Sequence, residues 1–397
     1  MNATDIFNKI IPFVSPNMHK TRQKALIACS QSLAQGNMAS VTNIGRGITS
    51  NAYDKHKIKR ADRLLSNTNI QRESLSIYGH ICRLFASREH PIISVDWSDL
   101  DSRGRHFLLR AASAFQGRTI TLYEEVHTVK TKDKPQTHKQ FLQVLKALLP
   151  KRTIPIIVTD AGFKTPWFNV IKSLGWDYVG RVRKPCLFSK NGLTDWFCIS
   201  KLYAAATATP KYITGYLVKT SPYPCRLALY KQKNKNRHAL NRDGSKRASA
   251  VSKKSAQGAK DPWLLVSSLK RSKNFAKKLV NIYKTRMQIE EGFRDMKSTK
   301  YGLGFEHNMT YRTDRLSVLV LLTTLTAMAL LLIGFTLETT KQHFKYQCNS
   351  VKNRRVVSLF FLGKRGVQTG CQILRFQWRR SIYQLQRLLA EMSYHNV

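Results

Sequence analysis

The sequence predicts an α/β fold, a mixed sheet with helices on both faces. Apolar, β-branched runs separated by turn signals begin at Pro91 and are typical of an antiparallel meander. Helix-like and strand-like segments then alternate as far as residue 183, an order typical of α/β proteins. Both ends of the chain instead show helical spacing. We therefore expect a helical domain over residues 1–80, an α/β domain over 85–335 with a β-rich insertion over 185–270, and a helical region over 336–397.

The first 80 residues predict helices near 20–35, 40–47 and 54–66. The third is rich in lysine and arginine, and a glycine-bearing turn precedes it. Two short helices with such a turn, the second of them basic, are typical of a helix-turn-helix DNA reader, although any basic helical bundle shows the same pattern. The residues expected to contact DNA here are Lys57, Lys59 and Arg60.

The α/β domain is predicted from the length and spacing of its apolar runs. PIISVDWSDL, RHFLLRAASAF and TITLYEEVHTV have strand character, and DSRG and QGR between them are turn signals. TIPIIVTD is a short apolar run of the kind found in buried parallel strands. After the meander we expect a helix over 137–149, a strand over 153–160, a helix over about 165–174 and a strand over 177–183.

Residues 185–270 break this alternation. YITGYLVKT, CRLALYKQ and WLLVSSL are strand-like and surround a polar, basic segment, Lys231 to Lys260. We interpret the segment as a phosphate-binding loop carried by a β-rich insertion, and a solvated linker is the alternative. Residues 336–397 are basic and helical in character, suited to DNA contact or to subunit pairing.

The composition points to a polyanionic partner. The chain of 397 residues has 67 Lys and Arg against 23 Asp and Glu, a formal charge of +44. Such a charge repels itself unless a polyanion neutralises it, and nucleic acids and anionic membranes are the abundant polyanions of a cell. The basic residues are spread along the whole chain, which favours a long, wrapped ligand. We therefore expect nucleic acid rather than a membrane.

Cysteine usage and the N-terminus indicate a reducing cytoplasm. The seven cysteines form no CxxC pair and are odd in number, which argues against a disulfide framework and a thiolate zinc site. The N-terminus lacks a basic segment followed by an apolar one, so no signal peptide is expected. Leu316 to Phe335 is long and apolar enough to span a bilayer, but its threonines and its isolation favour a helix buried in a soluble core.

Residues 281–300 predict a single helix with an ordered charged face. The stretch has no proline, one glycine and many helix formers. At about 100° per residue, five of its side chains fall within a stripe about 80° wide. A solvated face of i,i+4 ion pairs is the alternative. The stripe consists of Tyr283, Arg286, Glu290, Arg294 and Lys297.

Two predicted strands that could be neighbours in one sheet end in aspartate, Asp96 and Asp160. The carboxyl edge of such a sheet is where sites form, and Glu290 on the later helix could complete a group of three carboxylates. Three carboxylates repel unless cations lie between them, and their oxygens suit Mg²⁺ or Mn²⁺. Two ions about 3.5–4 Å apart would clamp an in-line phosphoryl transfer. Asp99 and Glu291 are nearby alternatives, and an aspartate that only caps a strand end is the plainer reading.

These motifs resemble those of a known family. The chain resembles DDE transposases of the insertion-sequence-four family, and within it the transposase of transposon ten. The resemblance lies in VDWSD at 95–99, TDAG at 159–162 and a spaced signature of four residues in the later helix. The likeness covers nearly the full chain, and a spaced four-residue signature beside two aspartate motifs is specific. These four residues, in the Y-(2)-R-(3)-E-(6)-K pattern of the YREK signature, are Tyr283, Arg286, Glu290 and Lys297.

The resemblance implies an RNase H-like fold for residues 85–335 and cut-and-paste transposition of a bacterial insertion sequence. A metal-activated water would nick one strand at terminal inverted repeats of double-stranded DNA, and the freed 3′-OH would form a hairpin with the opposite strand. Reopening the hairpin would leave 3′-OH ends that attack target DNA. Relatives act as homodimers on the DNA, and two Mg²⁺ ions per site are expected, with Mn²⁺ as a substitute.

In the same comparison, Asp96, Asp160 and Glu290 would be catalytic and would hold the metal. Trp263 matches a tryptophan that stacks where a base leaves the helix, although a core tryptophan of the insertion is the alternative. A metal-dependent nuclease that does not join strands, or a DNA-binding repressor without catalysis, are the other functions considered. The remaining residues expected to grip DNA near the site are Tyr283, Arg286, Lys297, Arg294 and Arg181.

Overall fold

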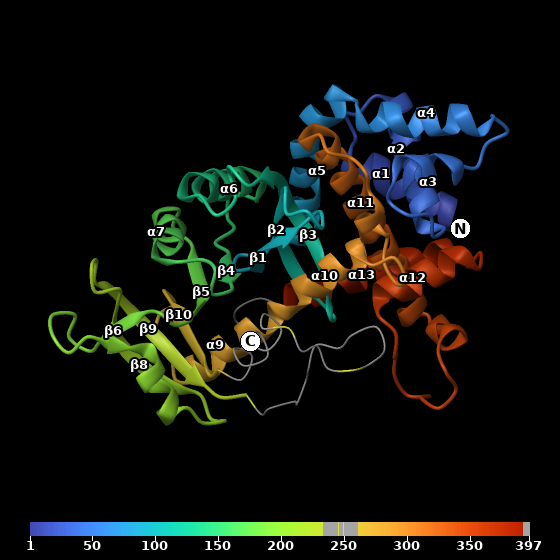
Figure 1. Cartoon of the computed structure of the whole chain (residues 1–397). Helices are drawn as coiled ribbons and strands as arrows, with labels where there is room; N and C mark the ends of the chain where they lie inside the picture. Colours follow the sequence, from blue (N-terminus) through green and yellow to red (C-terminus); the bar gives the residue numbers. More distant parts are fainter. Residues whose placement is uncertain (233–244, 246–248, 250–260, 392–397) are drawn as a thin grey trace. The chain divides into compact units, whose positions relative to one another are not determined.

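The computed structural model describes residues 1–232, 245, 249 and 261–391, which divide into two compact units. The first unit combines Met1–Ile154 with the chain from Met287 onward, and the second is Pro155–Arg286 (Figure 1). Each unit contains helices and strands, so the protein is of the mixed α/β class. The predicted phosphate-binding loop, Lys231 to Lys260, lies almost wholly outside the described residues.

Five helices form the N-terminal part of the described first unit. The predicted helices near 20–35, 40–47 and 54–66 are confirmed to within one residue at each end. Ser40 caps the third helix, because its side chain accepts the backbone N–H of Asn43. The first and fifth helices were not predicted. The five are α1 (Ala3–Val14), α2 (Lys20–Ala34), α3 (Val41–Arg46), α4 (Asp54–Leu65) and α5 (Thr68–Phe85).

The connection between α3 and α4 differs from the expected helix-turn-helix. Residues 47–53, seven in all, join the two helices, whereas the motif has a turn of about three or four residues. The helices still pack closely, because a Cβ added at Gly45 would lie 2.4 Å from the Cα of Ile58. Only glycine fits that approach. The helical character of residues 1–80 is therefore confirmed, while their role as a DNA-binding domain stays a prediction.

Three antiparallel strands form the sheet of the first unit, in the order β3-β2-β1, as the meander predicted. Trp97 on one face of β1 donates from Nε1 to Nε2 of His138 on α6 (Pro135–Leu148), at 3.1 Å. Ser98, on the opposite face, accepts a hydrogen bond from α10 (Met287–Lys297). Helices therefore cover both faces of this part of the sheet. The strands are β1 (Ile92–Asp99), β2 (His106–Phe115) and β3 (Arg118–Thr128).

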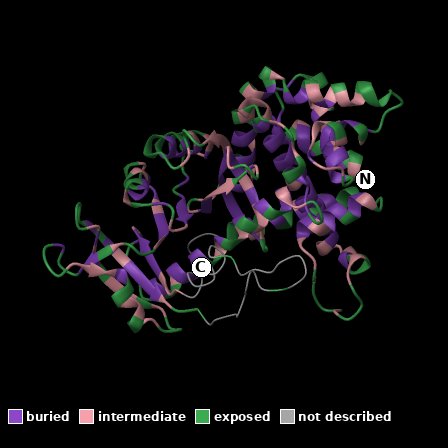
Figure 2. Ribbon diagram, in the orientation of Figure 1, coloured by how far each residue is buried: buried purple, intermediate pink, exposed green. Residues whose placement is uncertain are grey.

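The most apolar stretch of the chain forms α11 (Thr313–Thr339) in the core of the first unit. This helix is long and apolar enough to cross a membrane, with a mean hydropathy of 2.5 in its most apolar window, but 89% of that window is buried inside the protein (Figure 2). Three of its buried threonines donate their hydroxyl groups to carbonyls of the same helix, as Thr326 does to Leu322 at 2.8 Å, and Thr324 donates to Glu124 on β3. The burial is that of a core helix, as predicted.

The C-terminal residues of the first unit pack against α11. A Cβ added at Gly334 would lie 1.9 Å from the carbonyl oxygen of Leu359, and one at Gly363 would lie 1.8 Å from that of Leu330. Two glycines thus let the backbones of α11 and α12 approach one another directly. These elements are η3 (Gln342–Tyr346), α12 (Leu359–Gln368) and α13 (Arg375–Glu391), while η2 (Phe305–His307), before α11, contacts α10.

The second unit contains a seven-stranded mixed sheet in the order β4-β5-β10-β9-β8-β6-β7, counted over its described residues. β4 and β5 are parallel, as the buried apolar run predicted, and the later pairs are antiparallel. The strand-like pieces of residues 185–270 are confirmed as β8, β9 and β10. The elements are β4 (Ile156–Thr159), α7 (Thr165–Ser173), β5 (Asp177–Val182), β6 (Leu187–Ser189), β7 (Phe197–Cys198), η1 (Ile199–Ala205), β8 (Lys211–Leu217), β9 (Tyr223–Tyr230), β10 (Trp263–Ser267) and α9 (Phe275–Thr285).

The single helix predicted over 281–300 is wrong in one respect. The structure has α9 up to Thr285 and α10 from Met287, and the interruption falls on Arg286. The backbone N–H of Arg286 donates to the carbonyl of Tyr283, three residues back, at 3.1 Å. A bond of this type tightens the last turn of a helix. The predicted charged stripe is therefore divided between two helices.

Candidate active site

Asp96 lies within β1 and not at its end, which corrects the sequence-based position. The strand continues to Asp99, so Asp96 is the fifth of eight strand residues. Its Oδ1 accepts the backbone N–H of Trp97 at 2.9 Å, and the side chain is half-buried. Opposite it on β2 stands Arg110, which forms a buried ion pair with Glu124 on β3, Nε to Oε2 2.7 Å. The carboxylate of Asp96 thus belongs to a row of charged side chains across the sheet.

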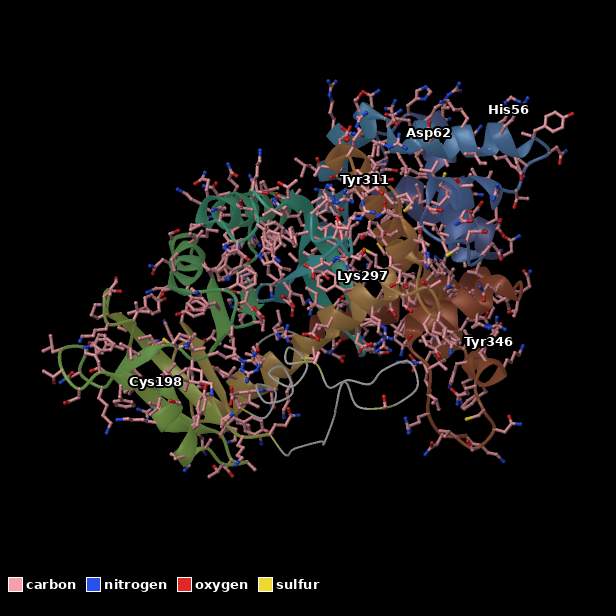
Figure 3. All side chains as sticks on the ribbon, in the orientation of Figure 1. His56, Asp62, Cys198, Lys297, Tyr311 and Tyr346 are labelled. Carbon is pink, nitrogen blue, oxygen red and sulfur yellow. The ribbon has the colours of Figure 1, made fainter. Side chains whose placement is uncertain are left out.

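Lys297 at the end of α10 contacts the same strand. Its Nζ donates to the Oγ of Ser98 at 2.7 Å (Lys297 is labelled in Figure 3). Ser98 and Asp96 are two residues apart on β1, so their side chains emerge from the same face. Burial lowers the pKa of Lys297, and nearby Asp99 and Glu306 oppose that shift. The C-terminal turn of α10 therefore lies beside the strand that carries Asp96.

Glu290 shares the Lys297 side of α10. Seven residues separate the two, which places them about 20° apart around the helix and about 10 Å apart along it. Glu290 is exposed at its surface. Glu291, the alternative acid, points toward β3, because its carboxylate lies 3.6 Å from Arg118 and 3.3 Å from Arg294. Asp99, the other alternative, lies 3.7 Å from Lys132.

In the second unit, Asp160 directly follows β4, as predicted. Its Oδ1 accepts the backbone N–H of Gly162 at 2.8 Å, which folds the TDAG turn back on the carboxylate. A Cβ at Gly162 would lie 3.1 Å from that oxygen, so glycine leaves room for the turn. The side chain of Asp160 is half-buried. The turn therefore fixes the direction of one carboxylate oxygen.

Tyr283 is the centre of a cationic and aromatic cluster in the second unit. Trp263 meets its ring edge to face, with centroids 4.9 Å apart, and the Arg286 guanidinium lies 5.8 Å from the ring centre. Burial raises the pKa of Tyr283, Arg286 and Arg181 hold it down, and Asp160 raises it further. Four residues expected to grip DNA thus lie close to one another, and Asp160 is near enough to act on the tyrosine.

Arg181 enters this cluster from β5, where it stands opposite Leu265 of β10. It donates from one terminal nitrogen to the carbonyl oxygen of Asp261 at 3.3 Å. Burial lowers the pKa of Arg181, and Tyr283 opposes the shift. Among the described residues, its buried Nε makes no hydrogen bond. The guanidinium thus retains donor capacity for an anion.

The basic residues predicted on α4 are partly engaged within the protein. Lys57 pairs with Asp54 at 2.8 Å, and Lys59 pairs with Asp62 at 3.2 Å. Arg60 donates to the backbone carbonyl of Lys24 on α2 at 3.0 Å. The acids three residues away in DKHK and KRAD are the sequence signal for these pairs. Lys55 and Arg63, which belong to the same basic run of the sequence but are not among the expected DNA contacts, are exposed.

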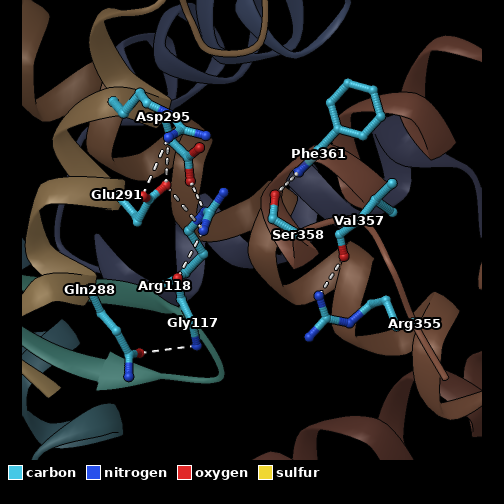
Figure 4. A network of polar contacts seen from close by, with 10 residues as sticks. Gly117, Arg118, Gln288, Glu291, Asp295, Arg355, Val357, Ser358 and Phe361 are labelled. Atoms are coloured by element: carbon cyan, nitrogen blue, oxygen red, sulfur yellow. Dashed lines mark hydrogen bonds and ion pairs between the residues drawn. The ribbon is translucent and has the colours of Figure 1, made fainter. Parts of the chain in front are cut away.

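A network that sequence reasoning missed fixes α10 to the β2–β3 hairpin (Figure 4). Arg118 pairs with Asp295, Nε to Oδ2 2.6 Å, and also faces Glu291. The side chain of Gln288 accepts the backbone N–H of Gly117 at 3.0 Å. Burial raises the pKa of Asp295 to about 6, and Arg118 opposes the shift. The register of α10 against the sheet, and with it the place of Glu290, depends on these contacts.

A comparison with protein families decides the class of this chain. The family model of the transposase DDE domain matches residues 87–332, well over half of the 397 residues. The chain belongs to this transposase family. No curated protein matches it. The match extends over β1 and β4, which carry Asp96 and Asp160, and over α10.

Transposases with this domain generally use divalent metal ions. Among the described residues, no group of three or more His, Cys, Asp or Glu side chains is close enough to hold a metal ion. Asp96 and Glu290 lie in the first unit, and Asp160 lies in the second. Carboxylate oxygens are nevertheless the donors that Mg²⁺ and Mn²⁺ prefer, and Asp96 and Asp160 each have one oxygen oriented by a backbone N–H. The oxygen donors of these carboxylates are therefore of the type that binds Mg²⁺ or Mn²⁺.

Proposed function

We propose that this protein is a cut-and-paste DNA transposase of a bacterial insertion sequence. It binds terminal inverted repeats, cleaves through a hairpin intermediate and joins the 3′-OH ends to target DNA. The observation that carries the proposal is the family match across the two strands that bear Asp96 and Asp160. The YREK spacing on Tyr283, Arg286, Glu290 and Lys297 supports the finer assignment to the insertion-sequence-four family and its transposon-ten branch.

Three carboxylates carry the catalysis in this proposal: Asp96, Asp160 and Glu290. Together they would hold two Mg²⁺ or Mn²⁺ ions, which supply an activated water and stabilise charge on the phosphate in flight. Lys297, beside the Asp96 strand, is placed to pair with a phosphate of the bound strand. The anchoring of α10 through Arg118 and Asp295 keeps Glu290 in a fixed orientation.

The cluster of the second unit serves the DNA strand. Hairpin formation requires a sharply bent strand with a base out of the stack. Arg181 and Arg286 bring positive charge to the ring of Tyr283, where they can hold phosphates near the bend. Trp263 is half-exposed at the start of β10, so its ring is accessible for stacking on a displaced base. In the first unit, exposed Arg294 on α10 adds a further cation suited to a phosphate.

Further parts of the proposal rest on charge and sequence pattern. Residues 1–80 form the DNA-binding domain, residues 85–335 the RNase H-like catalytic domain, and residues 336–397 a region for DNA contact or dimerisation. The enzyme acts as a homodimer on double-stranded DNA. It works in the cytoplasm, at the nucleoid, because a charge of +44 favours nucleic acid and α11 is buried in the core.

The test uses the full chain, MgCl2 and a DNA fragment that carries the inverted repeats flanking the gene. Denaturing gels separate the nicked strand, the hairpin and the joined product, and all three are expected. Nicks without a hairpin or a joined strand would show a metal-dependent nuclease instead. Bound DNA without any cleavage in Mg²⁺ or Mn²⁺ would show a repressor and would overturn the proposal.

A further inference from the structure

Helix α13 is attached to the first unit by one side only. Its buried residues follow helical spacing, and the hydroxyl of Ser381 lies 2.7 Å from that of Thr339 on α11. At about 100° per residue the buried positions fall within about 80° of one another. Within the described residues, the opposite side of the helix is not buried by any other element. The buried residues are Trp378, Ser381, Leu385 and Leu389.

The outward side of α13 alternates aromatic rings and guanidinium groups. Phe376 and Tyr383 are each 64% exposed, and Arg380 and Arg387 are exposed between and beyond them. The four positions fall within about 60° of helix circumference, centred nearly opposite the buried residues. A single exposed ring is ordinary on a protein surface, but here two rings and two guanidinium groups share one narrow stripe of a helix. We call these four residues the α13 face.

The charge of the helix selects the kind of partner. Glu391 is the one acidic residue of α13, and it lies at the last position. Its ion pair with Arg387 is 3.9 Å long between exposed side chains, so it is weak. A second copy of the same face would bring arginines against arginines, which disfavours self-association through it. The remaining arginines of the helix are Arg375, Arg379 and Arg380, all exposed.

We propose that the α13 face binds a DNA strand with accessible bases, with guanidinium groups on phosphates and aromatic rings on bases. Arg380 and Arg387 are about 10 Å apart along the helix, a span of about three nucleotides at 3.4 Å of axis each. Rings interleaved with basic groups are the pattern by which proteins hold unpaired strands without reading their sequence. The inference rests on DNA as the partner in the proposed function and adds a second contact surface to it.

The experiment measures fluorescence anisotropy of a labelled 30-nucleotide poly-dT strand, and of a 30-base-pair duplex, with the full chain in EDTA over a range of NaCl. Phe376→Ala with Tyr383→Ala should weaken poly-dT binding by about 25-fold or more, since each of the two stacked bases contributes at least about fivefold. Duplex binding should change less. Arg380→Gln with Arg387→Gln should lower the salt slope for poly-dT by about 1.4, because each phosphate contact contributes about 0.7.

The matched control is Phe13→Ala with Arg152→Gln, an aromatic of similar exposure, 63%, and an exposed arginine elsewhere. All the substituted side chains are exposed, and circular dichroism checks that each variant is folded. Unchanged poly-dT affinity in the aromatic variant overturns the proposal. So does a change in sedimentation that tracks the loss of affinity, since the face is then a subunit contact. Because EDTA removes the metal, this test measures binding without catalysis. If the protein cleaves DNA in MgCl2 but its poly-dT binding does not depend on α13, only this inference fails. If binding depends on α13 but no cleavage occurs in MgCl2, only the proposed function fails.

Discussion

The two strand-borne aspartates of this transposase stand in different surroundings. Asp96 lies in the middle of a strand, beside a sheet row whose arginine, Arg110, is already paired with Glu124 at 2.7 Å. Asp160 lies just past its strand, in a turn, and near enough to Tyr283 to raise its pKa. The first site is built from buried pairs and an anchored helix. The second is built from a turn and a group of arginines and aromatic rings.

The difference suggests a division of work between two carboxylates of the same chemistry. In the first unit, Arg110 and Arg118 are each paired with a protein carboxylate, and Lys297 donates to Ser98 on the Asp96 strand, so the site offers acids on a rigid frame with one lysine beside them. Around Asp160, Arg181 and Arg286 lie close enough to Tyr283 to lower its pKa, and Arg181 keeps an Nε that makes no hydrogen bond within the described residues. Arg181 therefore has donor capacity for a phosphate. We expect both acids to be needed for cleavage, and the second group to control the path of the DNA strand.

The largest expected effect tests whether the two acids are equivalent. Asp96→Asn and Asp160→Asn should each lower the rate of first-strand nicking by more than about 100-fold, because loss of even an outer partner of a metal ligand costs about 10–100-fold. Quantified nicking in MgCl2 gives the rates. Asp99→Asn is the matched control and should keep its activity, since Asp99 pairs with Lys132. Activity retained in only one of the two variants would break the comparison.

The second effect sharpens the role of α10 in the first site. Glu290→Gln should lower nicking by more than about 100-fold for the same reason. Glu291→Gln should nick at nearly the normal rate, because Glu291 faces Arg118 and Arg294 on another side of the helix. Its loss should lower the free energy of unfolding by about 1 kcal/mol or less, the range of exposed ion pairs. The reverse order of nicking rates would exchange the two assignments.

The third effect separates the second site from the first. Trp263→Ala should leave first-strand nicking within about threefold and lower hairpin formation by about tenfold, the contribution of one stacked base. Time courses on denaturing gels resolve the two steps. Trp263→Phe retains a ring and should restore most of the hairpin yield. Equal losses at both steps would show that the tryptophan supports the insertion sheet through Tyr283 and Tyr230 instead.

The smallest effect on catalysis concerns Asp295 in the anchor of α10. Its folded-state pKa of about 6 is above the ordinary value of 3.8, because burial disfavours the carboxylate. Protonated Asp295 therefore contributes to the free energy of unfolding, fully below about pH 4. This contribution is lost as the pH rises through about 6. The loss is of the order of 3 kcal/mol. Urea unfolding at pH 4.5 and 7 should show a fall in stability for the native chain that Asp295→Asn lacks.

The control for that prediction is Glu291→Gln. Its stability should still decrease between pH 4.5 and 7, because the decrease comes from the buried carboxyl group of Asp295. Parallel stability curves for the native chain and Asp295→Asn would show that Arg118 holds the carboxylate ionised. At pH 8 the nicking rate of Asp295→Asn should lie within about threefold of the normal rate, because Gln288 still holds α10 to the hairpin.

Much of the fold could be predicted because its elements have strong local patterns. The strand before Asp160 is a short apolar run, and the helices α2 and α4 begin and end at polar and glycine signals in the sequence. The threonines in the stretch that forms α11 predict a core helix, and its burial confirms the prediction. Local sequence determines these features, so no knowledge of distant contacts was needed.

The predictions that the structure corrects, and the contacts that the sequence did not predict, depend on tertiary contacts between distant residues. Asp96 was placed at a strand end, but pairing with β2 extends β1 to Asp99. The interruption at Arg286 falls within a run of good helix formers, where propensity alone predicts continuity. The Arg118–Asp295 anchor joins residues 177 positions apart, and no periodicity reports such a pair. The distance between the three carboxylates is likewise a matter of tertiary structure.

The long apolar helix α11 also constrains how the molecule is made. It contacts α1, α2, α5 and β3, all synthesised long before it. Until Thr339 leaves the ribosome, those partners lack the surface against which they pack, and the emerging chain exposes apolar area to its neighbours. A gene fragment ending before this helix should therefore yield an insoluble product, and a frameshift at that point would inactivate the transposase by preventing it from folding.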